Sequence, residues 1–390
     1  MKFEIQRSDK KIELLKQLAS RDVIKAQEAK EAIAAFIGPV IQEVINVAPT
    51  LSNIYARLPF EEDSNPSIPL DVYLNVTEED YIQVWSQAEP GGLPFNQPTP
   101  PTQELKFSTY RLDSAVAFQR KYAQQSRLDV LAKAMERLMQ EVLIKQDTNA
   151  AAVVLRALAL ASTTVNGIAT KHIIRSQNPN TLILHDFNRL FTLMKRLHSA
   201  WNGGTPEAGR GRGITDLLVS PEMVESLRAM AYNPINTRGG VVTRNTGSGT
   251  TATQSESAVA LTEQMRQEIF NNAGIPEFFG VNIMEIYELG VGYKYNDLFD
   301  GFAGSTSYAN HPGTSTGTTF DGTAEEIVIG IDMSTDSLIR PVATDAETSA
   351  EFNVMPDDQF VQRSGKIGFY GALEEGRIIL DDRAICGLIV

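Results

Sequence analysis

The sequence predicts an α+β fold, in which helices and strands occupy separate stretches of the chain. Residues 126–161 carry apolar side chains at the three- and four-residue spacing of one long helix, about 50 Å in length. Alternating or continuous apolar runs, which are typical of strands, concentrate in residues 326–390. Because no regular strand–helix–strand alternation links these segments, the pattern argues against a doubly wound parallel sheet.

The composition indicates a folded protein whose main task is not to grip nucleic acid. The chain has 390 residues, of which 42% are hydrophobic and 21% are charged, so it can bury a core. This excludes a disordered tail or a collagen-like fibre. With 48 acidic and 35 basic residues, the formal net charge is −13, which is unfavourable for neutralising phosphates.

Cysteine use and hydropathy predict a soluble protein made in a reducing cytoplasm. Cys386 is the one cysteine, so the chain can form neither an internal disulfide nor a CxxC metal or redox site. The richest apolar run, residues 150–161, is too short for a membrane helix and is interrupted by Arg156. The first thirty residues lack the apolar core of a secretory signal.

The beginning of the chain predicts an amphipathic helical arm, which ends before Gly38 and Pro39. Its apolar face consists of Ile5, Ile12, Leu15, Ala19, Val23, Ala26 and Ile33. Two interpretations remain open, because such a helix can pack on its own domain or lie on a neighbouring subunit.

Residues 59–112 predict a long two-stranded excursion. Alternation indicates strands over residues 71–76, 81–85 and 105–109, and a stretch rich in proline and glycine separates the last two. The excursion carries the aromatic residues Tyr73, Tyr81, Trp85 and Phe95. Because isolated hairpins are marginal in water and little neighbouring chain can cover this one, we expect it to lie on something else.

The remainder of the chain predicts a mixed domain. A second helix starts at Asp186, and a glycine-rich basic loop with Arg210 and Arg212 follows it. Residues 216–220 indicate a strand, and Pro221 opens another helix. The polar tracts at residues 237–257 and 301–323 are expected to be mobile loops on an exposed edge.

The search for catalytic and cofactor motifs predicts a protein that is not an enzyme and holds no cofactor or metal. The Gly365-Lys366 pair lacks the upstream glycine of a phosphate-binding loop, and residues 209–213 lack the GxGxxG spacing. No histidine pair has zinc-site spacing, and acidic pairs such as Glu374-Glu375 indicate turns or solvated charge. The alternative is a hydrolase that uses His185 and Asp186, although no GxSxG elbow supplies a nucleophile.

Three stretches resemble the major capsid proteins of tailed bacteriophages, which have the Hong Kong 97-type shell fold. They are residues 214–228 (ITDLLVSPEMVESLR), 274–281 (GIPEFFGV) and 363–382, which contains RSGKIGFYG. The resemblance implies an N-terminal arm (1–58), an extended β loop (59–112) and a peripheral domain with a spine helix (113–213). It further implies an axial domain (214–345) and C-terminal strands that complete the core (346–390).

The implied function is a structural protein that self-assembles, as hexamers and pentamers, into an icosahedral shell around a phage genome. Assembly in the host cytoplasm, a place in the virion capsid, and scaffolding, portal and possibly decoration proteins as partners would follow, with DNA packaged without tight binding. A bacterial encapsulin shell with a cargo partner is the alternative, and another phage part such as a tail or decoration protein is a third reading. The expected inter-subunit contacts are Tyr73, Trp85, Phe95, Arg210 and Arg212.

One departure from the chain-mail subtype predicts a noncovalent shell. That subtype links a lysine of the extended loop to an asparagine of the next subunit, but no lysine lies between Pro59 and Leu105, and Lys106 stands at the base. The arm is also shorter than a fused scaffolding domain of that family, so either a separate scaffold protein guides assembly or none is needed.

Overall fold

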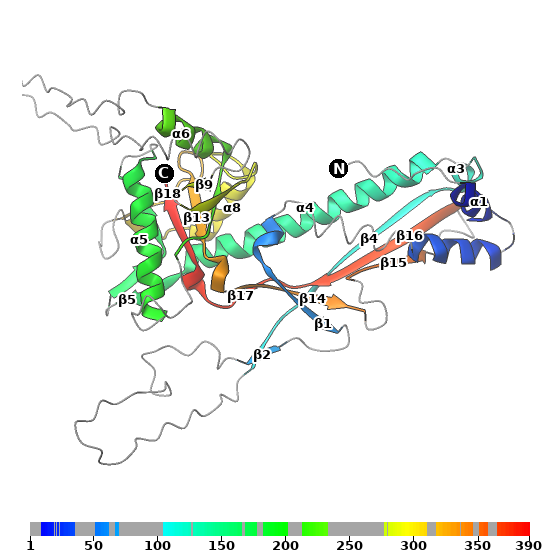
Figure 1. The fold of residues 1–390 in the computed structure, drawn as a ribbon, viewed down its shortest axis with the longest axis horizontal. Coiled ribbons are helices and arrows are strands. Elements are labelled where there is room, and N and C mark those ends of the chain that lie inside the picture. Colours follow the sequence, from blue (N-terminus) through cyan, green and yellow to red (C-terminus); the bar gives the residue numbers. More distant parts are fainter. Residues whose placement is uncertain are drawn as a thin grey trace, which may run out of the picture. The chain divides into compact units, whose positions relative to one another are not determined.

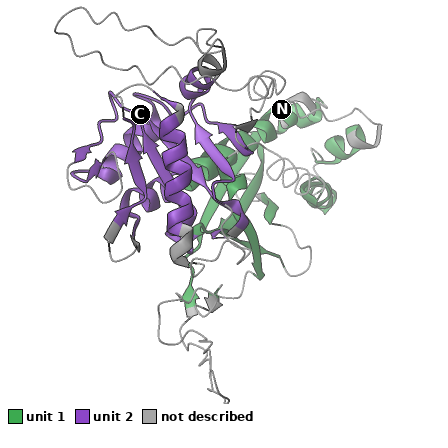
Figure 2. Ribbon diagram, turned by 60° about the vertical axis from the view of Figure 1, so that its left-hand side comes forward, with its two compact units in different colours: residues 1–69, 103–150, 339–378 green, residues 70–102, 151–338, 379–390 purple. Residues whose placement is uncertain are grey.

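The computed structural model describes most of the chain outside several long connecting segments. The described residues are 9–18, 20, 22, 24–35, 51–61, 67–69, 104–125, 128–165, 168–177, 182–201, 213–232, 277–278, 280–309, 317–335, 337–345, 351–357 and 365–390. Helices and strands alternate irregularly, which confirms the α+β class (Figure 1). The chain divides into unit 1, residues 1–69, 103–150 and 339–378, and unit 2, residues 70–102, 151–338 and 379–390 (Figure 2).

Unit 1 is organised around a sheet in which β16 is the central long strand. The strands are β1 (Ala56–Glu61), β4 (Tyr110–Gln119), β14 (Leu338–Thr344), β15 (Phe352–Asp357) and β16 (Lys366–Glu375). β16 runs antiparallel to both β15 and β4, and its pairing with β4 extends over all ten residues. β1 is parallel to β14, so the segments before and after the excursion join the same sheet.

The predicted long helix is confirmed as α4 (Leu128–Leu160), which has 33 residues. Its first part supplies Met135, Leu138, Met139 and Val142 to the core of unit 1, together with Phe118 of β4 and Phe369 of β16. The rings of Phe118 and Phe369 stack with centroids 6.3 Å apart. Apolar spacing on the helix thus matches alternate residues on the strands, and both elements bury the same core.

The N-terminal segment forms two helices, α1 (Asp9–Leu18) and a second over residues 24–35. Ser20 and Asp22 interrupt them: the Ser20 Oγ accepts from the amide of Asp22, and the Asp22 Oδ1 accepts from the amide of Ile24. Both helices bury residues in the core of unit 1, namely Leu15, Leu18, Ala29, Ile33 and Ala34. For residues 9–35 this favours the interpretation in which the helices pack on their own domain.

Short elements complete unit 1 at its edges. They are the 3-10 helix η1 (Leu51–Ile54), the strands β2 (Ser67–Pro69) and β3 (Glu104–Lys106), and the helix α3 (Arg120–Gln124).

Unit 2 contains a second sheet, whose strand order is β7-β18-β13-β8-β10-β9. The strands are β7 (Ile173–Arg175), β8 (Asp216–Val219), β9 (Glu277–Phe278), β10 (Val281–Glu285), β13 (Ile327–Ile331) and β18 (Ile385–Ile389). Every residue of β8, β13 and β18 is buried, as expected of strands covered on both faces.

Helices cover both faces of β18. Cys386 and Leu388 belong to the core shared with α5 (Leu184–Trp201) and α6 (Pro221–Tyr232). Between them, Gly387 points to the opposite face, where an added Cβ would lie 3.1 Å from a methyl group of Leu158 on α4. Glycine therefore lets the end of α4 approach the strand closely.

The remaining elements of unit 2 lie around this sheet. They are the hairpin β5 (Ser162–Val165) and β6 (Ile168–Lys171), the helix α8 (Lys294–Ala303), the hairpin β11 (Ser307–Ala309) and β12 (Gly317–Thr319), and the 3-10 helices η5 (Met333–Thr335) and η6 (Asp382–Ala384). The two-residue strand β17 (Ile378–Ile379) instead pairs with β14, in the sheet described for unit 1.

The prediction of an exposed loop over residues 301–323 is wrong for the part that the structure describes. Residues 301–303 end α8, and β11 and β12 form an antiparallel hairpin. Tyr308 is completely buried and Phe320 lies against Phe299, with ring centroids 4.9 Å apart. Two aromatic anchors thus override a composition that is otherwise typical of loops. The other tract, residues 237–257, lies outside the described residues.

In the part of the chain that the structure covers, we find no helix with the length and hydrophobicity needed to cross a bilayer.

Candidate functional site

The base of the predicted excursion is a short antiparallel pair in unit 1. β2 pairs with β3, with Ser67 opposite Lys106 and Pro69 opposite Glu104. This pairing brings Pro69 and Glu104, which flank residues 70–103, together. Lys106 lies at this base. The predicted contacts Tyr73, Trp85 and Phe95 lie outside the described residues.

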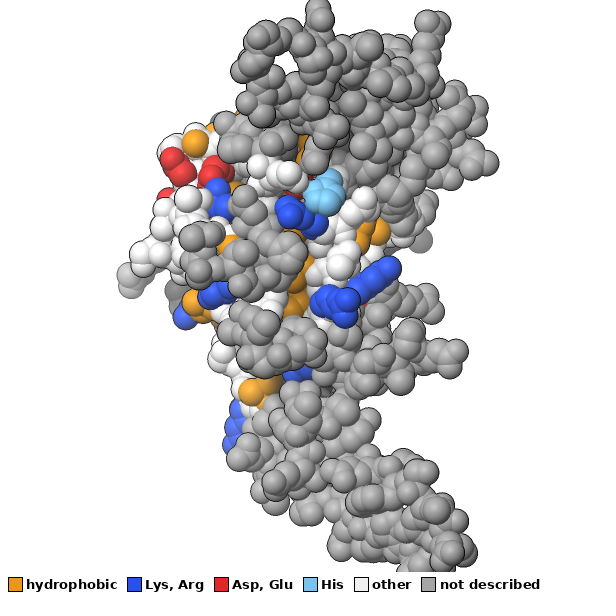
Figure 3. Space-filling view, turned by 90° about the vertical axis from the view of Figure 1, so that its left-hand side faces the viewer, with side chains coloured by type: hydrophobic (Ala, Val, Ile, Leu, Met, Phe, Trp, Pro, Cys, Tyr) orange, Lys and Arg blue, Asp and Glu red, His pale blue; other side chains and the backbone are white. Residues whose placement is uncertain are grey.

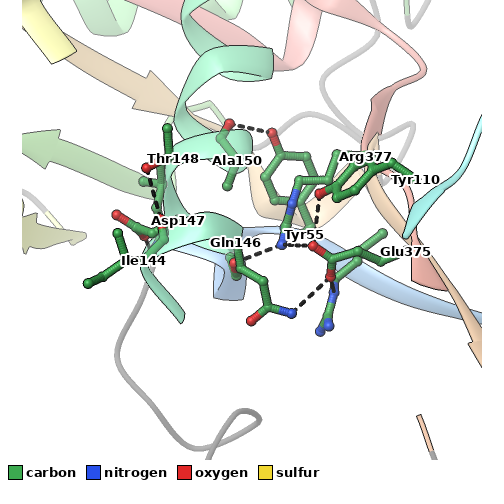
Figure 4. A network of polar contacts seen from close by, with 12 residues as sticks. Tyr55, Tyr110, Ile144, Gln146, Asp147, Thr148, Ala150, Glu375 and Arg377 are labelled. Carbon is green, nitrogen blue, oxygen red and sulfur yellow. Dashed lines mark hydrogen bonds and ion pairs between the residues drawn. The ribbon is translucent and has the colours of Figure 1, made fainter. Parts of the chain in front are cut away.

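A buried polar network anchors the strands that lead to this base (Figure 4). Its centre is Glu375, the last residue of β16, which is completely buried. Its Oε1 accepts from the hydroxyl of Tyr110 at 2.8 Å and from Arg377 Nη2 at 3.1 Å. Its Oε2 accepts from Arg340 Nε at 2.8 Å and from Gln146 Nε2 at 3.0 Å. One carboxylate therefore joins β4, β14, β16 and α4.

Arg377 and its neighbours fix the segment immediately before β1. Arg377 Nη2 also donates to the Oγ of Ser52 at 2.9 Å, and its guanidinium carbon lies 5.2 Å from the centroid of the Tyr55 ring. The hydroxyl of Tyr55 donates to the carbonyl oxygen of Ala150 on α4 at 2.9 Å. The segment that precedes β1 is therefore held on α4.

A second contact fixes the same segment to α4. The amide of Leu51 donates to the Oδ1 of Asp147 at 2.7 Å, which satisfies an amide at the start of η1. Together with the Tyr55 contact, it places two hydrogen bonds between residues 51–55 and one turn of α4.

The electrostatics of the network keep Glu375 charged. Burial alone would raise the pKa of Glu375, but the guanidinium groups of Arg377 and Arg340 outweigh it, so the pKa lies below its ordinary value. Two guanidinium groups share this single carboxylate, and Arg340 Nη2, Arg377 Nε and Arg377 Nη1 have no hydrogen-bond partner. Since both oxygens of Glu375 already accept two donors each, the group is suited to holding elements together and not to acid–base catalysis.

The two residues of the alternative hydrolase have separate environments in unit 2. Asp186 is completely buried, and its Oδ1 accepts from the amide of Gln177 at 3.1 Å. Its own amide donates to the carbonyl of Ile183, and burial raises the pKa of its carboxyl group. His185 is exposed on α5. Asp186 thus joins the start of α5 to the chain after β7.

The other sequence candidates do not form a site where the structure describes them. No group of three or more His, Cys, Asp or Glu side chains converges among the described residues. Glu374 and Glu375 point to different partners, because adjacent strand residues face opposite ways: Glu374 accepts from the hydroxyl of Thr109 at 2.5 Å. Arg210 and Arg212 lie outside the described residues.

The sequence analysis missed the network residues Arg340, Gln146 and Arg377. It assigned Glu375 to turn or solvated charge, whereas this carboxylate is buried. The one local signal is a glutamate followed two residues later by an arginine, between the mostly apolar residues 367–373 and 378–380. Such buried ionic residues need a partner, so this pattern could have indicated an internal ion pair.

Comparison with known proteins gives similarity in structure only. No family model matches the sequence, and no curated protein matches it. The chain is similar to the capsid of the cyanophage P-SCSP1u, with 12% identity, 87% of this chain and 88% of the other covered, and a TM-score of 0.48.

Two further similar structures are a capsid and an encapsulin complex. The capsid of a native GTA particle has 10% identity, covers 88% of this chain and 91% of its own, and has a TM-score of 0.46. The holo-SrpI encapsulin complex from Synechococcus elongatus PCC 7942 has 10% identity, coverage of 87% and 85%, and a TM-score of 0.44. Each of these structures covers most of this chain.

Proposed function

We propose that this protein is a structural major capsid protein, which self-assembles through hexamers and pentamers into an icosahedral shell around a phage genome. The observation that carries the proposal is the β2–β3 pair, which brings together the residues that flank the predicted excursion, Pro69 and Glu104. This excursion contains aromatic residues and prolines but has too few residues for a core of its own. Another copy of the chain would supply the surface that covers it.

The buried network supports this role mechanically. A loop that binds a neighbouring subunit must be fixed to its own subunit at its base. Otherwise the loop would move freely, and its contact would not hold the two subunits together. Glu375, Arg377 and Tyr55 fix the strand before the excursion to α4, and Tyr110 fixes the strand after it. Closed symmetric shells gain their stability from many such modest contacts repeated in every copy.

We assign the contacts and domains of the shell as the sequence resemblance implies. Residues 1–58 form an N-terminal arm, 59–112 the extended β loop, 113–213 the peripheral domain, 214–345 the axial domain and 346–390 the completing strands. Tyr73, Trp85 and Phe95 are assigned to contacts made by the extended loop, because buried aromatic residues dominate interface energies. Arg210 and Arg212 are assigned to contacts of the glycine-rich basic loop.

The shell is proposed to be noncovalent and to assemble in the host cytoplasm. The excursion has no lysine before Lys106 that could form a cross-link to a neighbour. Scaffolding and portal proteins, and possibly a decoration protein, are the proposed partners, and the enclosed DNA is held without tight binding.

An encapsulin-type compartment is the second candidate. The observation that favours it is the similarity to an encapsulin at coverage comparable to that of the phage capsids. The two functions differ in content, since an encapsulin encloses a cargo protein instead of a genome.

Sedimentation and electron microscopy of the purified chain, alone and with a candidate scaffold, test the proposal. We expect closed particles of uniform size that dissociate to single chains on a denaturing gel. A monomer under every assembly condition would contradict a shell, and covalent ladders on the gel would contradict a noncovalent one. Particles that enclose protein cargo and no nucleic acid would identify the encapsulin alternative.

A further inference from the structure

β4 is the longest edge strand in the part of the chain that the structure describes. All ten of its residues pair with β16, and no described strand pairs with its other side. Figure 1 shows β4 beside β16 in unit 1. At about 3.3 Å per residue, the free edge of β4 extends about 33 Å.

The ladder shows which backbone groups of β4 point to this free edge. The amide of Arg120 donates to the carbonyl oxygen of Gly365 at 2.9 Å, directly beyond the pair of Gln119 with Lys366. Hydrogen bonds in an antiparallel ladder recur at every second residue, so the even-numbered residues of β4 bond to β16. The odd-numbered residues direct their amides and carbonyls to the free edge, and their side chains are all exposed: Arg111, Asp113, Ala115, Ala117 and Gln119.

The edge of β4 lacks the features that normally prevent sheet edges from pairing. The other two edge strands of unit 1 each contain a proline, Pro59 in β1 and Pro356 in β15, whereas β4 contains no proline, lysine or bulge. Its two charged side chains, Arg111 and Asp113, have opposite signs and lie 3.4 Å apart near one end. An unprotected edge of this length is a template for another strand.

A sheet edge can join two chains without a large apolar surface, because main-chain hydrogen bonds supply the affinity. On the face shown in Figure 3, the hydrophobic side chains of the described residues lie in small areas among charged and polar ones. The edge of β4 therefore offers a kind of contact that this face does not.

We propose that β4 pairs antiparallel with β4 of a second copy of the chain, across a twofold axis at Ala115. The inference rests on the proposed shell function, in which copies must meet, and names one surface through which they do so. Only an axis at Ala115 pairs all five outward residues, which gives about ten hydrogen bonds. The contact is isologous, the type of interface found in the commonest symmetric oligomers.

The side chains agree with this register. Arg111 lies opposite Gln119 of the other copy, Asp113 lies opposite its Ala117, and Ala115 lies opposite itself, so no like charges face each other. An axis moved to Asp113 would place two aspartates opposite each other and leave Ala117 and Gln119 without partners in β4. Charge and hydrogen bonding therefore select the same axis.

The test measures self-association of the full-length subunit by sedimentation, with the variants Ala115→Lys and Ala115→Glu. Each variant alone places like charges opposite each other at the axis, whereas an equimolar mixture places opposite charges there. We expect each variant alone to associate about fivefold more weakly than the wild type, and the mixture to recover the loss. Gln140→Lys, at an exposed position on α4, is the matched control and should leave association unchanged.

Ala117 gives an independent check, because the register places it opposite Asp113 of the other copy. Ala117→Lys should strengthen association, and Ala117→Glu should weaken it. Ala117→Pro removes an outward amide and no bond to β16, so it should weaken association while the subunit still folds, as thermal unfolding measures.

Variants at Ala115 that associate like the wild type, or a mixture no stronger than either variant alone, would overturn the pairing. A loss caused by Ala117→Pro alone would mean that the edge binds a strand other than β4, such as one from a scaffold protein, and would also overturn it. Assembly is scored separately by electron microscopy. A wild-type chain that forms no shell under any condition contradicts the proposed function, whereas shells combined with unaltered association of every variant contradict this inference alone.

Discussion

Arg340 donates its Nε to the Oε2 of Glu375 at 2.8 Å, and both side chains are buried where β14 pairs with β16. Arg377 binds the other oxygen of the same carboxylate. Loss of the glutamate and loss of one arginine therefore have different consequences. Loss of Glu375 leaves two buried cations unpaired, whereas loss of Arg340 leaves the ion pair between Glu375 and Arg377 intact.

Substitution of Glu375 by glutamine is expected to lower the free energy of unfolding of the dissociated subunit by about 3 to 5 kcal/mol. Arg340→Met should cost less, because Arg377 still neutralises the carboxylate. Urea unfolding measures both. The control is Arg111→Gln, which breaks the half-exposed pair with Asp113 and should cost less than about 1 kcal/mol. A Glu375→Gln effect no larger than that of the control would contradict the central role of this carboxylate.

How much the sequence could predict depends on whether the signal is local. The helix α4 and the start of α6 at Pro221 follow from apolar spacing and from the position of proline, and both are confirmed. The partners of Glu375 are not local, since Tyr110 is 265 residues away and Gln146 is 229 residues away. No spacing rule connects such residues, so only the folded sheet brings them together. The buried hairpin at Tyr308 was missed because its polar neighbours dominate the composition.

His172 predicts a loss of stability in acid. It is completely buried; its Nε2 lies 2.7 Å from the hydroxyl of Thr163, and its Nδ1 lies 2.9 Å from the carbonyl of Asp382. A neutral ring that donates from Nδ1 and accepts at Nε2 satisfies both contacts. Burial lowers the pKa of His172 despite the opposing charge of Asp382. Stability is therefore full above the unfolded pKa of 6.5 and falls as the pH drops toward the lower folded pKa.

Unfolding measured at pH 8, 6.5 and 5 checks this dependence. Thr163→Val removes the hydroxyl that donates a hydrogen bond to His172 Nε2. It is expected to lower the free energy of unfolding at pH 8 by about 1 kcal/mol. His172→Gln should flatten the decline between pH 6.5 and 5. If the decline persists unchanged in His172→Gln, another group causes it.

Glu326 predicts the opposite dependence on pH. It is 3% exposed, and burial, followed by the nearby charge of Glu222, raises its pKa from 4.5 to about 7. Because the folded state holds this proton more tightly, its contribution is full below pH 4.5 and is lost as the pH rises through about 7. Glu326→Gln should raise the free energy of unfolding at pH 8 by about 1 to 2 kcal/mol, after solvent screening is allowed for. Glu225→Gln, at an exposed position of α6, is the control and should leave the free energy of unfolding at pH 8 unchanged.

Truncation of Trp85 to alanine is expected to impair assembly more than folding of the subunit. The reason is that an aromatic side chain at an interface contacts its partner only when copies meet. Its truncation therefore removes a contact from the assembly and none from the isolated subunit. Phe299→Ala gives the contrasting result, because this ring is completely buried in unit 2 and its loss should cost about 3 to 5 kcal/mol of subunit stability. Sedimentation measures assembly, and thermal unfolding measures stability. Equal losses of both in Trp85→Ala would place that side chain in the subunit's own core.

The most direct measurement excises the excursion at its paired base. Replacing residues 70–103 by Asn-Gly joins Pro69 to Glu104 through a two-residue hairpin turn, which the β2–β3 pairing accommodates. Thermal unfolding and sedimentation are then compared with those of the intact chain under assembly conditions. We predict a subunit that unfolds at an unchanged temperature and forms no shells. Normal shells, or a subunit that no longer folds, would contradict the claim that this excursion is stabilised by other copies of the chain.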